Sequence, residues 1–376
     1  MKRSITNLII YFLLPLILLV SGLLLCREKT GKVGRGIYSA FFGIVIFALA
    51  ALRSFVGTDY QSYAQLYNYF NFAEMEEVSE LAHEKGFVVP LKILCDIFED
   101  YHAIFVVTAF FIAAAAAIYI YKFSSDPCIS ALSFVCFGMF FYSMNFIRQM
   151  IAGVIVMFAM EFIREKSFLR YLVAVMFAAC FHWSALVMIP FYFILQIRLE
   201  PLVLGAYAAV SAMLLIFADD IIDLGLKTLY TKYLTDYTPD LGSGVSIAYL
   251  LCYGVLFISA FVLRKSLYSK NEMNSVYLSC LFFVVMFEML GARYAMLSRF
   301  GLLFVMSAFM GLAPDLVSSA SEAAKEKFPA RPRLASALVY TAFALVAAGF
   351  YLWLIFSGSN GAVPYRTVFE YSREIW

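Results

Sequence analysis

Residues 102–121 read HAIFVVTAFFIAAAAAIYIY, twenty residues without Asp, Glu, Lys or Arg. A helix needs about 20 predominantly apolar residues to cross the hydrocarbon core of a bilayer. Further apolar runs lie on both sides of this stretch, from 5–25 and 37–55 near the start to 298–313 and 334–356 near the end. The stretch therefore predicts one membrane-spanning helix among many.

The composition of the whole chain supports this prediction. Of its 376 residues, 63% are hydrophobic and 14% are charged, and the mean hydropathy is +0.84. Soluble domains are about half apolar and about one quarter charged, so a soluble globular enzyme is excluded. The net charge of +2 and the lack of a Lys/Arg run argue against a nucleic-acid partner. The seven cysteines are scattered without metal-ligand spacing, so neither structural zinc nor a disulfide framework is expected.

The apolar runs predict an all-α polytopic protein with about twelve spans, forming a single integral membrane domain over residues 1–376. The first run follows Lys2 and Arg3, as in a signal peptide, but we interpret it as an uncleaved span. Two runs meet at Phe146 and Ile147 almost without a loop, which leaves a re-entrant pair as an alternative. The predicted spans are 5–25, 37–55, 102–121, 129–146, 147–163, 168–182, 184–197, 201–218, 245–263, 276–291, 298–313 and 334–356.

The distribution of Lys and Arg predicts the orientation of these spans. One set of loops holds sixteen basic residues, against eight in the loops of the other side. Because basic loops stay in the cytoplasm, we expect the first set inside and both termini outside, although Lys2 and Arg3 favour the reverse. Two long segments, 56–101 and 219–246, then face outward, and long loops of this kind usually carry function. The cytoplasmic set is 27–36, 122–128, 164–170, 198–200, 264–275 and 314–333.

Residues 141–152 read FYSMNFIRQMIA and place polar groups within an apolar run. On a continuous helix, Asn145, Arg148 and Gln149 share one face. An arginine near the hydrocarbon core costs about 2.5 to 3.5 kcal/mol, so this one needs a reason beyond snorkelling to the interface. The guanidinium of Arg148 offers a bidentate fork for a phosphate, and the two amides suit a glycan.

Residues 53–63 read RSFVGTDYQSY, at the outward end of the second predicted span. Thr58 and Gln61 have the spacing of a capping box, which accounts for those two residues structurally. It explains neither Arg53, a candidate phosphate ligand, nor Tyr60 and Tyr63, candidate glycan-binding residues. Asp59 is a candidate for binding a sugar hydroxyl or for acting as a base.

Residues 178–184 read AACFHWS and join two predicted spans almost without a loop. His182 is either an interhelical hydrogen-bonding group or a neutral imidazole that acts as a general base. Trp183 is either an interfacial residue or a platform for a sugar ring.

Residues 288–299 read EMLGARYAMLSR and gather one carboxylate with Arg293 and Arg299 at an outer turn. An intramembrane pair of Glu288 with an arginine is one interpretation, and binding of a phosphate is the other. In the second long segment, Tyr233 and Tyr237 have aromatic faces that suit sugar rings, but an amphipathic helix lying on the membrane explains their spacing equally well. Asp219 and its acidic neighbours 220 and 223 fit a helix N-terminus better than a divalent cation.

Several short motifs, in this order, resemble the EpsG family of polysaccharide polymerases, a branch of the Wzy-like proteins. They span most of the chain, and no single one is diagnostic. Two arginines stand where the family often has one, so the resemblance does not decide between Arg293 and Arg299. The motifs are Arg53 with Gly57-Thr58-Asp59 and Tyr63, Glu84-Lys85-Gly86-Phe87, residues 145–152, Phe181-His182-Trp183-Ser184-Ala185-Leu186, Lys232-Tyr233 with Tyr237, the arginines of 293–299, and Val363-Pro364-Tyr365.

The resemblance implies a GT-C-like glycosyltransferase of the bacterial cytoplasmic membrane, with its active site facing the exterior or periplasm. Such a protein polymerises undecaprenyl-pyrophosphate-linked repeat units into O-antigen, capsule or exopolysaccharide, without a nucleotide sugar, cofactor or metal. The expected partners are these lipid-linked units within the bilayer, a chain-length regulator and a flippase. The resemblance fits arginines that stabilise a pyrophosphate leaving group.

Other classes of membrane protein remain as alternatives. A lipid-linked glycan flippase or a secondary transporter also has about twelve spans, but it tends to show inverted repeats and charges near the midplane. A membrane acyltransferase would use a cytosolic donor, whereas His182 is expected outside. For the polymerase, His182 is the preferred base over Asp59, because histidine has a reference pKa of about 6.5 and aspartate one of about 3.9.

Overall fold

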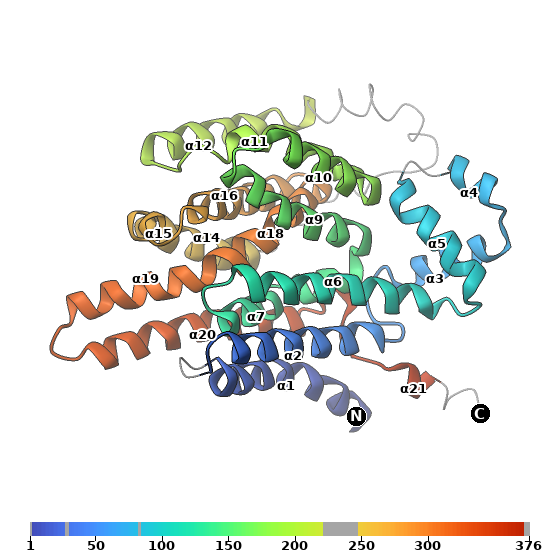
Figure 1. Ribbon diagram of the computed structural model, residues 1–376, viewed down its shortest axis with the longest axis horizontal. Coiled ribbons are helices and arrows are strands. Elements are labelled where there is room, and N and C mark those ends of the chain that lie inside the picture. Colours follow the sequence, from blue (N-terminus) through green and yellow to red (C-terminus); the bar gives the residue numbers. More distant parts are fainter. Residues whose placement is uncertain (1, 27–29, 82–83, 221–246, 372–376) are drawn as a thin grey trace.

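The computed structural model describes residues 2–26, 30–81, 84–220 and 247–371, and within these ranges the chain is helical without a strand (Figure 1). The helices of the first half are α1 (Lys2–Leu25), α2 (Gly31–Ala51), α3 (Tyr60–Phe72), α4 (Met75–Leu81), α5 (Lys85–Ile97), α6 (His102–Phe123), α7 (Pro127–Cys136), α8 (Met139–Asn145), α9 (Ile147–Arg164) and α10 (Phe168–Phe181). Those of the second half are η2 (Trp183–Val187), α11 (Met188–Ile194), α12 (Pro201–Ile216), α14 (Ile247–Val262), α15 (Arg264–Lys270), α16 (Met273–Gly291), α17 (Ala295–Ser298), η3 (Arg299–Gly301), α18 (Leu302–Met306), η4 (Ser307–Gly311), α19 (Leu312–Lys327), α20 (Pro332–Phe356), η5 (Ser359–Gly361) and α21 (Val368–Tyr371).

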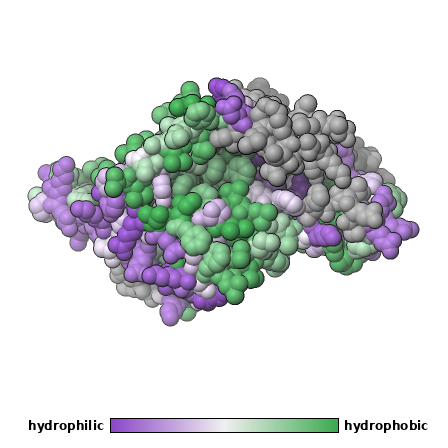
Figure 2. Space-filling model, turned by 90° about the horizontal axis from the view of Figure 1, so that it is seen from above, coloured by the Kyte–Doolittle hydropathy of each residue, from purple (hydrophilic) through white to green (hydrophobic). Residues whose placement is uncertain are grey.

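The surface of this bundle is that of a membrane protein. Figure 2 shows hydrophobic atoms across the middle of the molecule and hydrophilic atoms gathered towards the two ends of its long axis. Large apolar side chains stay exposed on the outer helices, among them Leu202 at 86%, Ile247 at 73% and Leu345 at 68%. In water such a surface would aggregate, whereas lipid solvates it. The predicted all-α polytopic membrane class is thus confirmed.

The number of spans depends on how bent helix pairs are counted. Six helices in the described part of the chain have the length and composition to cross a bilayer, or eight if each of two bent pairs counts as one span. Three shorter apolar helices, 168–181, 183–194 and 201–216, lie beside them. Helix α9 has 18 residues but includes Arg148, Glu161 and Arg164. The predicted count of about twelve therefore stays a prediction.

Two local predictions are wrong. The run 129–146 is not one straight helix, because α7 and α8 are bent by 54° around Gly138, whose φ is +92°. The expected loop 314–333 is mostly helix: α19 continues to Lys327, and only the residues up to Arg331 turn the chain into α20. This segment is polar but rich in Ala, Glu and Lys, residues that favour a helix beyond the membrane boundary as well as within it.

The segment 56–101 folds into a compact helical unit. In α3 the buried residues are Tyr60, Tyr63, Tyr67 and Phe70, which recur every three or four positions and form one face. This face packs against α5 and α6. Figure 1 places α3, α4 and α5 at one end of the bundle and the turn between α19 and α20 at the opposite end.

The C-terminal segment returns to the start of this unit. Arg53 and Thr367 form an isolated antiparallel bridge. The backbone N–H of Ser54 donates to Arg366 O at 2.9 Å, and that of Gly57 donates to Gly361 O at 2.9 Å. The C-terminal segment thus holds the start of this unit in place.

Candidate active site

Glu84 joins two candidate residues that are distant from it in the sequence. One oxygen of its carboxylate accepts a hydrogen bond from Arg148 Nη1 at 2.5 Å, and the other lies 2.7 Å from His182 Nδ1. The backbone N–H of Trp183 also donates to Glu84, at 3.2 Å. We call Glu84, Arg148 and His182 the charged triad.

A close helix contact brings the triad together. Glu84 immediately precedes α5, and His182 follows the last residue of α10. A Cβ atom on Gly86 would lie 2.7 Å from Cys180 Cβ and 2.9 Å from the Cys180 carbonyl, closer than real atoms pack. Glycine therefore allows the start of α5 to approach the end of α10 closely enough for Glu84 to reach His182.

The charges of the triad support one another. Burial by itself would raise the pKa of the Glu84 carboxyl, but the hydrogen bond with His182 and the Arg148 guanidinium outweigh it and hold this pKa below the usual value. An ionised carboxylate only accepts hydrogen bonds, so His182 Nδ1 must carry the proton that it donates. Nε2 of His182 has no hydrogen-bond partner among the described residues, so it is the ring nitrogen that is available to a substrate.

Arg148 keeps part of its guanidinium accessible. Its side chain is 41% exposed, whereas that of Glu84 is 12% exposed. The guanidinium lies over the ring of Phe87, 5.8 Å from its centroid, and interacts electrostatically with the buried Tyr63. These contacts orient the arginine and leave donors free for an anionic ligand.

The predicted shared face of Asn145, Arg148 and Gln149 is wrong. The helix is interrupted at Phe146, which has ψ of +54° and lies between α8 and α9. Asn145 Oδ1 accepts a hydrogen bond from Thr58 N at 2.6 Å, and its Nδ2 donates to Phe141 O at 3.0 Å. Asn145 thus ties the loop around Thr58 to α8, on the other side of the break from Arg148.

The same contacts replace the predicted capping box. Thr58 Oγ1 lies 3.0 Å from Asn145 Oδ1 and 3.1 Å from Asp59 Oδ1, and α3 begins without a side-chain cap. The Thr58 hydroxyl therefore contacts Asn145, which is distant in the sequence, instead of capping α3. Gly57, with φ of +107°, permits this contact, because a Cβ there would lie 2.8 Å from Asn145 Oδ1.

Gln149 connects Arg148 with one of the two later arginines. It is 4% exposed, and its Nε2 donates to the Arg299 backbone O at 2.6 Å. The Arg299 guanidinium lies over the Phe146 ring, 5.2 Å from its centroid, and makes no ion pair in the described part of the chain. Arg299 is thus next to the helix that carries Arg148.

Arg293 has a different partner. It forms an ion pair with Asp219 through Nη2, and its Nε donates to Asp219 Oδ1 at 3.2 Å. Hydrogen bonds from Arg293 and Tyr294 hold the pKa of Asp219 below its usual value. Glu288 forms no ion pair with any described residue, so the pair of Glu288 with an arginine is not formed within these ranges.

Arg53 lies inside the protein rather than beside the triad. Its side chain is 1% exposed, and its guanidinium donates to the carbonyls of Ala50 and Met144 and lies over the ring of Phe105. Tyr60 is also 1% exposed and stacks on the same Phe105 ring, with centroids 4.1 Å apart. The binding roles of both residues stay predictions, because internal contacts account for their positions.

The remaining candidates differ in their surroundings. Trp183 is 54% exposed next to the triad, whereas Tyr63 is buried behind Arg148. Asp59 is partly exposed and close to Thr58. Tyr233 and Tyr237 lie outside the described residues. In the described ranges no three His, Cys, Asp or Glu residues gather as a metal site would require, and the expectation of no metal stays a prediction.

Glu84 is central to the triad, although it is not among the residues predicted for the site from the sequence. It is one of nine acidic residues in the segment 56–101. The available signal was the motif Glu84-Lys85-Gly86-Phe87, in which the glycine and the phenylalanine now have defined contacts with Cys180 and Arg148.

We expect Gly86→Ala to lower activity at least about tenfold, because overpacking at such a contact costs roughly 1 to 3 kcal/mol and moves Glu84 away from His182. The matched control is Gly205→Ala in α12, where nothing lies within 4 Å of the added Cβ. Both variants are compared for glycan polymerisation per amount of membrane protein. Equal activity of the two would show that the contact at Cys180 does not position the triad.

Comparison with known proteins gives one match. No curated protein and no solved structure shows significant similarity to the chain. The family model of the EpsG family matches residues 36–367, which include all three residues of the triad. Because this match covers most of the chain and confirms the resemblance of the motifs, the chain belongs to the EpsG family, a family of Wzy-like polysaccharide polymerases.

Proposed function

We propose that this protein polymerises oligosaccharide repeat units linked to undecaprenyl pyrophosphate, at the outer face of the bacterial cytoplasmic membrane. The observation that carries this proposal is the Glu84 carboxylate, which holds a partly exposed arginine and a histidine on its two oxygens. The arginine can bind a phosphate, and the histidine can remove a proton from a sugar hydroxyl.

In the proposed reaction the growing glycan leaves its pyrophosphate carrier. The bond between the anomeric carbon and the pyrophosphate oxygen breaks, and the released pyrophosphate takes the bonding electrons. Arg148 and Arg299 stabilise the negative charge that develops on it. The acceptor hydroxyl of a second lipid-linked unit attacks the anomeric carbon, and His182 Nε2 takes its proton.

Glu84 orients both the base and the arginine that binds the pyrophosphate. Its hydrogen bond to Nδ1 holds His182 in the tautomer whose Nε2 accepts a proton, as a carboxylate does for the histidine of a catalytic triad. Its ion pair fixes the direction of the Arg148 guanidinium. Trp183 is the proposed sugar platform, because it is the exposed aromatic residue adjacent to His182 in the chain.

The glycan pattern of a deletion strain tests the function. We expect loss of long polysaccharide chains while single repeat units on their final carrier are retained. Accumulation of lipid-linked units in the cytoplasmic leaflet would instead identify a flippase. Purified protein should also polymerise lipid-linked repeat units without a nucleotide sugar, which neither a flippase nor a secondary transporter does.

The orientation of the protein in the membrane can be tested by cysteine labelling. We expect a cysteine in place of Gln65, which is exposed on α3, to react with a membrane-impermeant thiol reagent in intact cells. A cysteine in place of Lys327, at the other end of the bundle, should react only after the cells are opened. Both variants use a background without the seven native cysteines. The reverse labelling pattern would place the triad in the cytoplasm and contradict the outer-face proposal.

His182→Asn should lose turnover while retaining donor binding, whereas Asp59→Asn should mainly weaken substrate affinity or lower protein yield. The measurement is polymerisation by purified protein against pH. We expect the wild-type rate to fall as the pH drops, because a base that already carries a proton cannot accept another.

Glu84 keeps its charge to lower pH than an ordinary glutamate, because His182 and Arg148 hold its pKa below the usual value. A fall in rate that begins above the carboxyl range should therefore be absent from the residual activity of His182→Asn and persist in Asp59→Asn. An inactive Asp59→Asn beside a fully active His182→Asn would reverse the two roles.

A further inference from the structure

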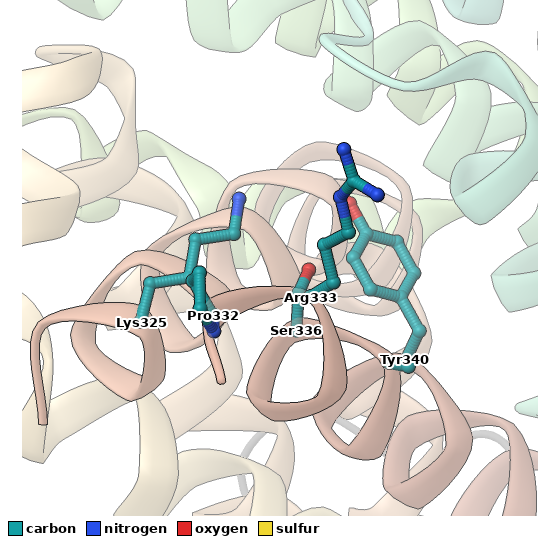
Figure 3. A pocket seen from close by; sticks show the side chains of 6 residues that line it. Lys325, Pro332, Arg333, Ser336 and Tyr340 are labelled. Carbon is teal, nitrogen blue, oxygen red and sulfur yellow. The ribbon is translucent and has the colours of Figure 1, made fainter. Parts of the chain in front are cut away.

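A pocket of about 560 Å³ lies between α19 and α20, at the opposite end of the bundle from the triad. Figure 3 shows the Lys325 amine and the Arg333 guanidinium extending to the same side, with the Ser336 hydroxyl between them in this view. The Tyr340 hydroxyl extends towards the Arg333 side chain. The lining residues are Lys325, Pro332, Arg333, Ser336, Ala337 and Tyr340.

The pocket holds two positive charges that no ion pair offsets in the described part of the chain. Neither Lys325 nor Arg333 forms a hydrogen bond or an ion pair through its side chain with any described residue. Two carboxylates, Asp126 and Glu322, act electrostatically on Tyr340, but neither pairs with Lys325 or Arg333. Asp126 accepts hydrogen bonds from Cys128 N at 3.0 Å and Ile129 N at 3.2 Å, and Glu322 pairs with Lys270 at 2.8 Å.

The pocket also lies at one end of a predicted span. Helix α20 is one of the predicted spans, and the pocket begins at its first residue, Pro332. Tyr340 is eight residues further on, which corresponds to about 12 Å along the helix axis. Polar groups from Arg333 to Tyr340 therefore extend from the aqueous side into the headgroup region, where Arg and Tyr are favoured.

Helix α20 also exposes apolar side chains along its length. Arg333, Ser336, Ala337 and Tyr340 recur every three or four residues and share one face of α20. Leu334, Leu338 and Leu345 lie about a third of a turn around the helix from this face and are 51%, 61% and 68% exposed. A molecule with its charged head in the pocket can thus place apolar chains against the same helix.

We propose that this pocket binds the phosphodiester headgroup of an anionic phospholipid. Lys325 and Arg333 contact the phosphate oxygens, and the Tyr340 hydroxyl donates to the headgroup. Ser336 Oγ lies 2.6 Å from Ser321 Oγ, so it can accept the Ser321 hydrogen and donate its own to the lipid. The acyl chains lie along the leucines of α20. This site does not depend on the proposed polymerase activity.

The experiment compares two double variants of the full-length protein. Lys325→Gln with Arg333→Gln removes the charges of the pocket, and Lys327→Gln with Arg331→Gln removes equal charge from exposed residues outside it. Binding of phosphatidylglycerol to protein in phosphatidylcholine nanodiscs is measured by native mass spectrometry. The pocket variant should bind at least about tenfold more weakly, because it loses the two charges that contact the phosphate, whereas the control should bind within about twofold of wild type.

Three results would overturn the proposal. Equal loss in both double variants would show a diffuse charge effect rather than a pocket. Equal retention of phosphatidylcholine and phosphatidylglycerol by the wild-type protein would show that the headgroup charge is not recognised. If inorganic phosphate raises the melting temperature of the detergent-purified protein as much as phosphatidylglycerol does, the ligand is a soluble anion.

A milder variant, Tyr340→Phe, should weaken lipid binding without changing the melting temperature in phosphatidylcholine.

Discussion

Glu84→Gln is expected to lower polymerisation about a hundredfold or more. Glutamine has nearly the same shape but no charge. Its amide nitrogen would face either the Arg148 guanidinium or the His182 Nδ1–H, both of which are donors in the native contacts. One substitution therefore disturbs the base and the phosphate-binding arginine together.

The measurement is the polymerisation rate of purified protein on lipid-linked repeat units, normalised to folded protein. Glu74→Gln is the matched control, because Glu74 is exposed in the same segment and lies outside the triad. We expect the control to retain activity close to the wild-type level. Wild-type activity in Glu84→Gln, with an unchanged pH profile, would show that the carboxylate neither orients His182 nor serves Arg148.

Arg148→Lys is expected to abolish most polymerisation while the protein still accumulates in the membrane. Lysine retains one positive charge, which suffices for the ion pair with Glu84. It lacks the second arm of the guanidinium, so it cannot hold Glu84 and a phosphate oxygen pair in a fixed geometry. The expected loss of transition-state stabilisation is roughly 2 to 4 kcal/mol, or about thirty- to a thousandfold in rate.

The control for this variant lies on the same helix. Arg164→Lys changes the last residue of α9, where the arginine pairs with Glu161 at 2.8 Å, far along the helix from Arg148. It should leave the rate within about twofold, because exposed ion pairs of this kind contribute less than about 1 kcal/mol. Full activity of Arg148→Lys at a normal protein level would refute the pyrophosphate role of Arg148.

The membrane class, the family and two residues of the candidate triad could be singled out from the sequence. Apolar runs such as 102–121 require lipid around them wherever they lie in the fold, because their transfer from water depends on composition and length alone. Arg148 and His182 could be identified in the same way, since a polar side chain in an apolar run is costly and needs a reason. The order of the short motifs was enough to identify the resemblance to the EpsG family.

Other features depend on contacts between distant segments. Glu84 lies 64 residues from Arg148 and 98 residues from His182, so no local pattern indicates that one carboxylate binds both. Likewise, the break at Phe146 separates Asn145 from Arg148, and the burial of Arg53 depends on Met144 and Phe105.

The sequence by itself determined that this chain is a helical membrane protein of the EpsG family, because hydrophobicity and motif order are properties of the residues alone. Only the tertiary structure decided which charged residues meet. The physical reason is the short range of hydrogen bonds and ion pairs, which form only where helices approach closely. Here that approach depends on Gly86, which has no side chain to separate α5 from α10.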